Sequence, residues 1–587
     1  MMKKSKKKQL TNAVLCCLLT GGAGWAVAAP SGGLLREVVS PHAGALNKDM
    51  QQVPQGMPEG KLPAVSFSIP ADDSVPRHGN DALRVVVRTV TLDTGIIPPK
   101  HHGAVQALLT PWLNEPVTFS GLQEMTFAVT TYYRNQGYVV AKAILPPQKI
   151  TDGNLTIRVV EGRWDEPSVA NHSRLNAAFA QKMVRTGICS NNTCDAAVAT
   201  RSDIEREVLL LSELPGVSAQ VSLAPGQVAE TTQLNVTLKK GKPYGGYISA
   251  DNQGSAYSGR GRAMGGVYIN NLTGYADQLN ASFMLSDSAD MLTGTLEYSM
   301  PVGYYGTRGG LRYSYLDYSL KGPFSALDAR GNYSEWRGYI THPLVRSADA
   351  RMNVRADLFE QQTQDERRQT DADKRTIRGG AFGVDGLYAL LPNGLTGASL
   401  NGTVGTTDLR NELVRAIDAR TVGINGGFAR LNIGLSHEQS IGSRLAFYNR
   451  LDGQLASHNL DGSQKMSLGG PGGVRAYGVG EGSADTGLVY TTELRASWYP
   501  ALHRLVAQDH KLTTAAFFDQ ALGSYYKSLP GVYADDNKLN MSGFGSYIAL
   551  GRDADYSLRL TWAHRTGEAM GAGTDTDKWW VTAYKAF

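Results

Sequence analysis

The sequence predicts two small α+β domains followed by an antiparallel transmembrane β-barrel of about 16 strands. Three observations support this fold class. One pattern of strands and helices occurs twice in succession, and the chain from Tyr244 onward alternates apolar and polar residues in many short segments. No apolar run reaches the roughly 18 residues that a membrane-spanning helix needs, so only strands would cross a membrane. A chain of 587 residues is long enough for several such units.

Residues 1–28 are expected to be a secretory signal peptide. Lysines between Lys3 and Lys8 precede an apolar core at residues 13–19, and Ala26-Val27-Ala28 suits a cleavage site. An anchoring helix is the alternative, but this apolar core is short. Residues 29–52 then form an N-terminal tail, and five prolines in residues 53–82 indicate a semi-extended linker.

Residues 83–162 and residues 163–242 are expected to be two copies of one domain. Each copy places helices between strands, with a capping-box sequence that begins at Ser120 in the first copy and at Ser202 in the second. Five pairs of pattern-defining residues are offset by 79 positions, and a constant offset indicates duplication. These pairs are Gly137 and Gly216, Leu155 and Leu234, Ile157 and Val236, Val159 and Leu238, and Gly162 and Gly241.

Cys189 and Cys194 are the two cysteines that remain after the signal peptide. In an oxidising compartment they should form a disulfide that closes a short loop between two helices. Half of a zinc site is the alternative interpretation. It is disfavoured because the sequence has no second cysteine pair and the nearest histidine, His172, is 17 residues away.

Residues 243–587 show the alternation expected of barrel strands, with one face toward lipid and the other toward a polar lumen. About 345 residues at roughly 20 to 22 per strand and turn give about 16 strands, an even number as barrels prefer. The strand at residues 488–498 illustrates the pattern. Its apolar face carries Leu488, Tyr490, Leu494, Ala496 and Trp498, and its polar face carries Thr491, Glu493, Arg495 and Ser497.

A glycine-rich loop at about residues 469–486 precedes this strand and carries one arginine, Arg475. Glycines allow positive φ angles and close backbone approach, so the loop can fold inward through a crowded lumen. A buried guanidinium needs a carboxylate partner, which can accept two hydrogen bonds from it. The alternative is that Arg475 is one more solvated charge in the lumen.

These features resemble the two-partner secretion transporters of the outer membrane (the ShlB/FhaC/HecB or TpsB type), which export haemolysins, adhesins and related exoproteins. Gly469-Gly470 followed by Val474-Arg475-Ala476-Tyr477 resembles the lumen-folded loop of that family. Phe517-Phe518-Asp519-Gln520-Ala521 resembles its F-x-D-x-G motif, with Ala521 where the family usually has glycine. Each repeated domain resembles a POTRA (polypeptide-transport-associated) domain. The DNQGS segment at residues 251–255 and the N-x-x-G-x-x-D pattern of Asn271, Gly274 and Asp277 resemble the first strands of such barrels.

The resemblance implies a structural role for several parts. Arg475 and Asp519 would form an ion pair inside the barrel, and Asp519 faces the lumen only if Phe517, on the same strand face, packs beneath the loop. The tail at residues 29–52 would hold a plug helix, although Pro41 limits its length. A disordered tail is the alternative. The barrel would lie in the outer membrane, with the POTRA domains in the periplasm.

The implied function is export of an unfolded exoprotein that bears an N-terminal secretion domain. An extended segment of this partner would add to a POTRA sheet edge. A haemolysin, an adhesin, a contact-dependent toxin and a haem-scavenging protein all fit as cargo. An assembly or insertase factor for outer-membrane proteins, from the wider POTRA-barrel superfamily, is the alternative function. The candidate edges are residues 139–145 and 217–223, with Val139, Val140, Leu145, Val217 and Val221 as candidate contacts.

The sequence contains no H-E-x-x-H, no G-x-S-x-G and no phosphate loop. We therefore expect no enzyme activity, no cofactor and no metal, and we interpret His101-His102 as a solvated surface pair. The net charge of +5 comes with no basic run interleaved with aromatic residues beyond the N-terminus, so nucleic acid is not an expected partner. The other expected contacts are the bilayer with its lipopolysaccharide and the barrel-assembly machinery, which reads an aromatic terminal residue such as Phe587. We expect a monomer.

Overall fold

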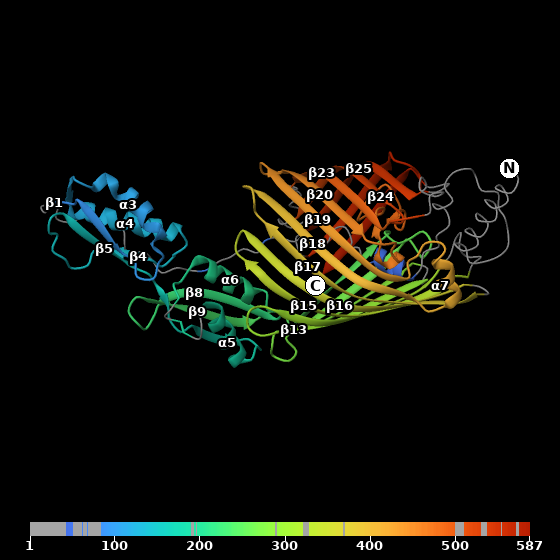
Figure 1. Cartoon of the computed structure of the whole chain (residues 1–587), viewed down its shortest axis with the longest axis horizontal. Helices are drawn as coiled ribbons and strands as arrows, with labels where there is room; N and C mark the ends of the chain where they lie inside the picture. Colours follow the sequence, from blue (N-terminus) through green and yellow to red (C-terminus); the bar gives the residue numbers. More distant parts are fainter. Residues whose placement is uncertain are drawn as a thin grey trace, which may run out of the picture.

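The computed structural model describes residues 43–50, 62, 67, 84–189, 193–194, 197–287, 290–320, 328–367, 370–498, 510–529, 537–552, 555–570 and 575–587. The expected signal peptide (1–28) and most of the expected linker (53–82) lie outside the described residues. Figure 1 shows two small α+β domains in a row, followed by a large β-barrel that the second domain contacts at one end.

The first domain packs its helices against a small sheet. Three strands have the order β2-β5-β4, and β5 runs parallel to β2 and antiparallel to β4. β1 and β3 form a separate two-stranded sheet. The elements are β1 (Arg84–Val86), β2 (Thr89–Asp93), η1 (Pro99–His101), α3 (His102–Leu109), η2 (Thr110–Trp112), β3 (Pro116–Thr118), α4 (Phe119–Asn135), β4 (Lys142–Ile144) and β5 (Asn154–Val160).

The second domain has a related arrangement with a longer hairpin. Its strand β9 pairs in parallel with β6 and β7 and antiparallel with β8. Two helices precede the hairpin. The elements are β6 (Arg163–Trp164), β7 (Ser168–His172), α5 (Ala177–Ile188), α6 (Arg201–Ser212), β8 (Val217–Pro225) and β9 (Thr231–Lys240).

The apolar positions that define the repeat face the two domain cores. Alternate residues of β5 and β9 are buried, and the glycines that precede β4 and β8 both have positive φ. Glycine adopts such angles without steric strain, so the chain can turn sharply before each strand. The buried residues are Leu155, Ile157 and Val159 on β5 and Leu234, Val236 and Leu238 on β9, and the glycines are Gly137 and Gly216.

Both helices expected from capping boxes begin earlier than predicted. The N-cap of α4 is Thr118 rather than Ser120, and the N-cap of α6 is Thr200 rather than Ser202. Each threonine is in an extended conformation, and its hydroxyl accepts a hydrogen bond from the backbone N–H three residues later. Threonine satisfies a free N–H of the first turn as serine does, so the chain uses the earlier cap.

Two expectations for the first domain are wrong. The strand expected at residues 139–145 is reduced to β4, because Val139 and Val140 lie in a turn and pack with the core of the second domain. His101, expected at the surface, is buried and lies edge-on to the ring of Tyr133. In both cases the burying groups come from chain segments that are distant in sequence.

Among the described residues, sixteen strands form one closed antiparallel barrel, as predicted. Neighbours in sequence are neighbours in the barrel, and β10 pairs with β27 to close it. α7 (Glu412–Asp418) lies at the end remote from the two domains (Figure 1). The strands are β10 (Tyr244–Asp251), β11 (Arg262–Asn270), β12 (Gln278–Ser286), β13 (Met291–Pro301), β14 (Arg308–Ser319), β15 (Arg330–Arg346), β16 (Ala350–Arg367), β17 (Thr370–Tyr388), β18 (Gly394–Leu409), β19 (Gly426–Ile441), β20 (Leu445–Ala456), β23 (Thr486–Trp498), β24 (Lys511–Ser524), β25 (Lys538–Arg552), β26 (Tyr556–Arg565) and β27 (Asp577–Ala586).

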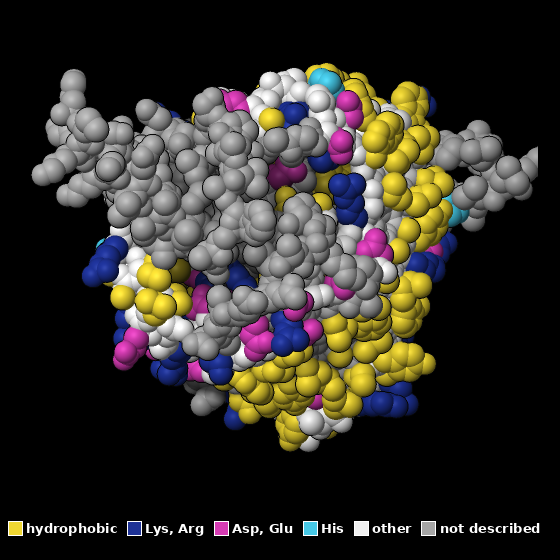
Figure 2. Space-filling model, turned by 90° about the vertical axis from the view of Figure 1, so that its right-hand side faces the viewer, with side chains coloured by type: hydrophobic (Ala, Val, Ile, Leu, Met, Phe, Trp, Pro, Cys, Tyr) yellow, Lys and Arg dark blue, Asp and Glu magenta, His cyan; other side chains and the backbone are white. Residues whose placement is uncertain are grey.

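The outer wall of the barrel is apolar. On β23, Leu488, Leu494 and Trp498 are exposed on the outside, whereas Glu493 is buried on the inside. Figure 2 shows hydrophobic side chains gathered along the part of the outer wall visible in that view. Lipid can cover such a surface without leaving any backbone group unpaired, because the closed ladder satisfies them. No helix in the described part of the chain is both long and apolar enough for a membrane span.

The second domain is fixed to the turns at one end of the barrel. Asn176, the N-cap residue of α5, donates its backbone N–H to the carbonyl of Gly274 in the β11–β12 turn (2.7 Å). Arg346, the last residue of β15, pairs with Glu213 after α6 (2.8 Å). Phe179 of α5 also packs against a tyrosine of the β11–β12 turn. These contacts give the second domain a defined orientation at the barrel mouth.

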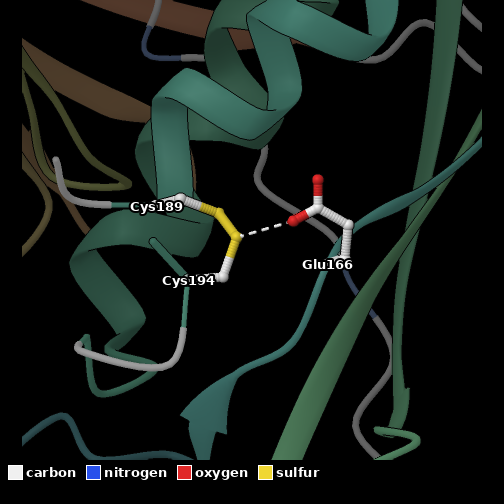
Figure 3. Close-up of side chains that lie close together, drawn as sticks. All are labelled: Glu166, Cys189 and Cys194. Atoms are coloured by element: carbon white, nitrogen blue, oxygen red, sulfur yellow. Dashed lines mark hydrogen bonds between the residues drawn. A yellow bond between two sulfur atoms is a disulfide. The ribbon is translucent and has the colours of Figure 1, made fainter. Parts of the chain in front are cut away.

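A disulfide joins Cys189 and Cys194 in the segment between α5 and α6. Figure 3 shows the carboxylate of Glu166 directed at this disulfide, with its Oε2 3.1 Å from the Sγ of Cys194. The other carboxylate oxygen of Glu166 pairs with Arg185 of α5 (2.7 Å). Because the two sulfurs are bonded to each other, neither is available as a thiolate ligand, and the zinc alternative loses its cysteines.

Glu207 on α6 is a buried carboxyl group in the core of the second domain. It is 1% exposed, and its Oε1 has no hydrogen-bond partner among the described residues. It lies against Gly187 of α5, where a side chain would clash with the carboxyl group. Burial raises the pKa of Glu207 to about 8 from its usual 4.5. The carboxyl is therefore protonated and uncharged in the folded domain at neutral pH.

We predict that Glu207→Gln removes a pH dependence from the stability of the second domain. The folded pKa lies above the unfolded value. The contribution of the protonated carboxyl group to the free energy of unfolding is therefore complete below pH 4.5, and it is lost as the pH rises through about 8. The loss reaches about 3 kcal/mol at pH 7, at about 1.36 kcal/mol per pKa unit. Helix melting followed by circular dichroism in the detergent-solubilised protein checks this. Glu124→Gln, at an exposed position of α4, is the control. An equal pH dependence in Glu207→Gln and the unchanged protein would contradict the prediction.

Candidate functional site

The loop between β20 and β23 folds back into the barrel. It contains the short helix η4 (Gly462–Gln464) and a hairpin of β21 (Met466–Ser467) with β22 (Ser483–Ala484). Backbone hydrogen bonds close the tip, from Gly469 N–H to the carbonyl of Glu481 (3.0 Å) and from Val474 N–H to the carbonyl of Leu468 (2.8 Å). Gly470 has a φ of 97°, a conformation that favours glycine. The loop is therefore a compact unit that carries Arg475 at its tip.

Arg475 and Asp519 are brought together in the lumen. The Nε of Arg475 donates to Oδ2 of Asp519 (2.8 Å), and its Nη2 donates to Oδ1 (2.7 Å). The backbone N–H of Arg475 also donates to Oδ2 (3.1 Å). The arginine is 3% exposed and the aspartate 0%. One carboxylate therefore holds both the side chain and the backbone of the loop tip.

Glu493 on β23 is a second carboxylate partner of the same arginine. Nη1 of Arg475 donates to Oε1 of Glu493 (2.6 Å), while Oε2 accepts from Arg495 (2.8 Å) and from the hydroxyl of Tyr547 (3.3 Å). Glu493 lies on the polar face of β23, as expected, but its pairing with Arg475 was not predicted. That role depends on the register of β23 and β24, in which Asp519 stands opposite Thr491, two residues from Glu493 along the same face.

Aromatic side chains complete the arginine site. The Cζ of Arg475 lies 3.4 Å from the ring centroid of Phe517, which packs beneath the loop as expected for an inward-facing Asp519. The indole N–H of Trp580 on β27 donates to the carbonyl oxygen of Arg475 (2.8 Å). Val474 and Tyr477 are fully buried beside it, and the Tyr477 hydroxyl donates to the carbonyl of Glu568 (2.9 Å). Ala521 is buried in the same apolar cluster as Val474 and Tyr477 of the loop.

The energetics of this site favour a fully docked loop over a partly withdrawn one. Removing ions from water costs several kcal/mol each, and only complete pairing offsets that cost. Here Arg475 has a carboxylate at both ends of its guanidinium and an aromatic ring below it. Withdrawing the loop part of the way would remove Arg475 from the buried carboxylate of Asp519, whereas Glu493 would keep Arg495, so intermediate positions are disfavoured.

A second cationic site ties the loop to the opposite wall. Arg375 on β17 donates from Nη1 to Asp461, the N-cap of η4 (2.8 Å), and from Nη2 to Asp365 on β16 (3.2 Å). Within the loop, Lys465 pairs with the buried Asp485 (2.8 Å). The loop is thus bound by charges to β16 and β17 as well as to β23 and β24.

A short helix from the N-terminal tail, α2 (Ala43–Met50), lies in the lumen beside this loop. It contacts η4 and strands β14, β15 and β16, and it is the blue segment within the outline of the barrel in Figure 1. The backbone N–H of Ala43 donates to Oδ1 of Asp365 (3.0 Å), the carboxylate that also binds Arg375. Leu46 is buried in a cluster with Val479 of the loop. The helix begins at Ala43, after Pro41, and residues 29–42 of the expected tail lie outside the described residues.

The candidate POTRA edge residues are dispersed. Val217 and Val221 lie on β8 with their side chains in the core of the second domain. Leu145 follows β4 and packs against the core of the first domain. Val139 and Val140 are in the turn between α4 and β4 of the first domain. Of the two expected edges, only β8 is a strand over the full predicted length.

The fold and this site define a class of protein: a membrane barrel with an apolar outer wall and a polar lumen that holds a folded loop, with two α+β domains preceding the barrel and the second of them fixed at one mouth. The profile of the family "Haemolysin secretion/activation protein ShlB/FhaC/HecB" matches residues 230–527, and that of "POTRA domain, ShlB-type" matches residues 87–162. The chain belongs to the ShlB/FhaC/HecB family. It is an outer-membrane transporter of a two-partner secretion system, with its POTRA domains in the periplasm and a secreted exoprotein as its partner.

Relatives extend this similarity along most of the chain. "Heme/hemopexin transporter protein HuxB" of Haemophilus influenzae (strain 86-028NP) is 28% identical over 552 residues, which cover 93% of this chain and 95% of the relative. "Outer membrane transporter CdiB" of Dickeya dadantii (strain 3937) is 22% identical over 407 residues, or 66% and 68% of the two chains. The solved structure of CdiB from Escherichia coli has the same fold, with a TM-score of 0.67 at 19% identity over 92% of this chain and 95% of that one.

We predict that Arg475→Ala inserts into the outer membrane but releases little exoprotein. Removing one partner of a buried pair costs about 3–5 kcal/mol, so the loop would lose its docked position in most molecules. An unanchored loop would obstruct the path of the exoprotein, and secretion should fall about tenfold or more. Immunoblots of the medium and of outer-membrane fractions measure both quantities. Arg450→Ala is the matched control, because Arg450 is a half-exposed lumen arginine of β20 paired with Asp452. Normal release by Arg475→Ala would remove the proposed role of the loop.

Proposed function

We propose that this transporter captures an unfolded exoprotein by strand addition at the outer edge of β8 and passes it through the lumen after the loop and α2 have moved. β8 carries this proposal. Among the described strands it pairs with β9 alone, so its other edge offers unpaired backbone groups. It has nine residues, whereas β4 has three and β7 has five. A longer edge forms more backbone hydrogen bonds with an added strand.

The position of β8 also supports this role. The strand begins at Val217, immediately after Gly216, and Gly216 lies against Asn270 and Asn271 at the domain-facing end of β11. The bonds that dock α5 on the β11–β12 turn hold this geometry. A segment added to β8 would therefore have one end at the barrel mouth, from where it could continue into the lumen.

We further propose that α2 is a plug that rests in the lumen together with the loop. Asp365 links the two, because it accepts from the backbone of Ala43, from the hydroxyl of Tyr318 (2.7 Å) and from Arg375 (3.2 Å), which also holds Asp461 of the loop. Movement of the loop would remove Asp461 from Arg375, and movement of α2 would remove the Ala43 N–H from Asp365. Each movement weakens the group that holds the other segment, so the plug and the loop should leave their sites together.

The remaining partners follow from location and family. The apolar outer wall would meet outer-membrane lipid and lipopolysaccharide, and the barrel-assembly machinery would insert the chain as a monomer. Transport needs no enzymatic step or cofactor in this proposal, since folding of the cargo outside the cell would drive export. The HuxB relatives, which cover nearly the whole chain, are named for heme/hemopexin transport, and this favours a haem-scavenging exoprotein among the expected cargo classes.

We predict that the exoprotein cross-links to the edge of β8. A photoreactive residue in place of Gln220, which is exposed on β8, should capture the secreted partner in living cells. The same residue in place of Ala170, exposed on β7, is the matched control and should capture little. Equal capture at both positions would contradict the choice of edge.

Deleting the transporter tests the wider function. Loss of one exoprotein supports export, whereas loss of many outer-membrane proteins supports an assembly factor. Undiminished growth of the deletion strain on haem–hemopexin as iron source rejects only the haem-scavenging cargo class.

We predict that Arg375→Gln opens the lumen. The change removes the cation between two buried carboxylates, Asp365 and Asp461, and should loosen α2 and the loop together. Ion conductance in planar bilayers should rise several-fold over that of the unchanged protein. Arg378→Gln is the control on the same strand, because Arg378 is 62% exposed and pairs with Glu360. Equal conductance of the two variants would show that Arg375 does not hold the plug.

A further inference from the structure

The seam at which the barrel closes is its shortest strand pairing. β10 and β27 are in register over five residue pairs, from Tyr247 opposite Ala586 to Asp251 opposite Thr582. Among the described strands, each other pair of neighbours in the barrel is in register over at least eight. A shorter ladder has fewer backbone hydrogen bonds to resist separation. The seam is therefore where the wall would part sideways unless other groups hold it.

Asn252 extends this seam with its side chain. Its backbone N–H donates to the carbonyl of Val581 (3.3 Å), and its Oδ1 accepts from the N–H of Val581 (2.8 Å). Its Nδ2 donates to the carbonyl of Trp579 (2.9 Å). A side-chain amide thus replaces the backbone amide of a further strand residue and continues the ladder beyond the end of β10.

The neighbours of Asn252 hold it in this position. Asp251 accepts two hydrogen bonds from Arg262 of β11, from Nε (2.7 Å) and Nη2 (2.8 Å), and both residues are buried. The same carboxylate accepts from the N–H of Gln253 (2.9 Å), and Nε2 of Gln253 donates to Thr582 of β27 (2.7 Å). In the DNQGS segment, Asn252 and Gln253 therefore bind β27, and Asp251 binds the backbone of Gln253 and Arg262 of β11.

Trp580 ties the same part of β27 to the lumen loop. It lies between Trp579 and Val581, the two residues that Asn252 binds, and its indole N–H donates to the carbonyl of Arg475 (2.8 Å). Val479, four residues further along the loop, belongs to the same buried cluster as Trp580 and Met284 of β12. The loop therefore lies across the seam on its inner side, with contacts to strands on both sides of it.

We propose that Asp251, Asn252, Gln253 and Trp580 form a seam latch, which keeps the first and last strands paired while cargo passes through the lumen. Asn252 closes the edge, and Trp580 couples that edge to the loop. While Arg475 is bound at Asp519, its carbonyl holds β27 from inside. When the loop withdraws, the side chains at Asn252 continue to hold the seam. The four are positioning residues. The proposal that these residues close the seam is independent of the proposed function. The statement that the seam stays closed while cargo passes rests on the proposed function.

Heat stability of the barrel tests the latch without any cargo. In electrophoresis of the full-length protein in detergent, Asn252→Ala should lower by several degrees the temperature at which the folded band converts to the unfolded one. Asn401→Ala is the matched control, since Asn401 lies on β18 and accepts from Thr403 of the same strand. Conversion of both variants at the temperature of the unchanged protein would overturn the latch.

A covalent lock across the seam provides the second test. Ala250 and Ala583 stand opposite each other on the outer face of β10 and β27, so Ala250→Cys with Ala583→Cys should form a disulfide on mild oxidation. The locked protein should secrete at the level of its reduced form, and the lock should restore the heat stability that Asn252→Ala loses. Failure to form the disulfide, or loss of secretion on locking with recovery on reduction, would overturn the proposal. In the second case, recovery of secretion on reduction would show that the protein still exports, so the latch would be rejected and the proposed function would not.

Coupling between Trp580 and the loop is the third test. Trp580→Phe keeps the ring and removes the N–H donor, so it should lower the conversion temperature by less than Asn252→Ala. If Trp580 acts through the bound loop, Trp580→Phe should cause no further loss in a protein that already carries Arg475→Ala. A full additional loss in that double variant would show that Trp580 stabilises the barrel without the loop.

Discussion

A buried guanidinium between two carboxylates, Arg475 with Asp519 and Glu493, is the interaction on which the rest of the lumen depends. It fixes the tip of a long loop against β23 and β24, and the loop in turn supports β27 and packs beside α2. Charges in a closed, poorly solvated space gain stability only when all of them are paired. The barrel wall is therefore stabilised by its backbone ladder, whereas the contents of the lumen are stabilised by charges that must be matched.

These two sources of stability suit a transporter. The ladder and the apolar outer face do not change when the lumen is emptied, because they depend on strand neighbours and lipid. The lumen contents depend on a small number of ion pairs that link separate segments: Asp365 joins the wall to α2, and Arg375 joins the wall to the loop. A pathway can then open by exchanging these pairs for water without any strand leaving the barrel.

The sequence was sufficient to predict features that repeat or alternate locally. The 79-residue offset of Leu155 and Leu234 and the two-sided pattern of β23 follow from periodicity, and the structure has both. Features that depend on another segment were missed. Glu493 has its role only once the register of β23 and β24 is known, Val139 is buried by a different domain, and His101 by aromatic rings of a helix that follows it. Thr118 and Ser120 are equally able to cap a helix, so sequence alone did not separate them.

The length of β8 has a consequence for the exported chain. Nine extended residues, at about 3.3 Å each, span roughly 30 Å, which is also about the thickness of the hydrocarbon layer. A segment that occupies this edge and reaches the cell surface at the same time must therefore hold about twenty residues in extended form. That length is the shortest leader with which an exoprotein can begin to fold outside while it is still bound within.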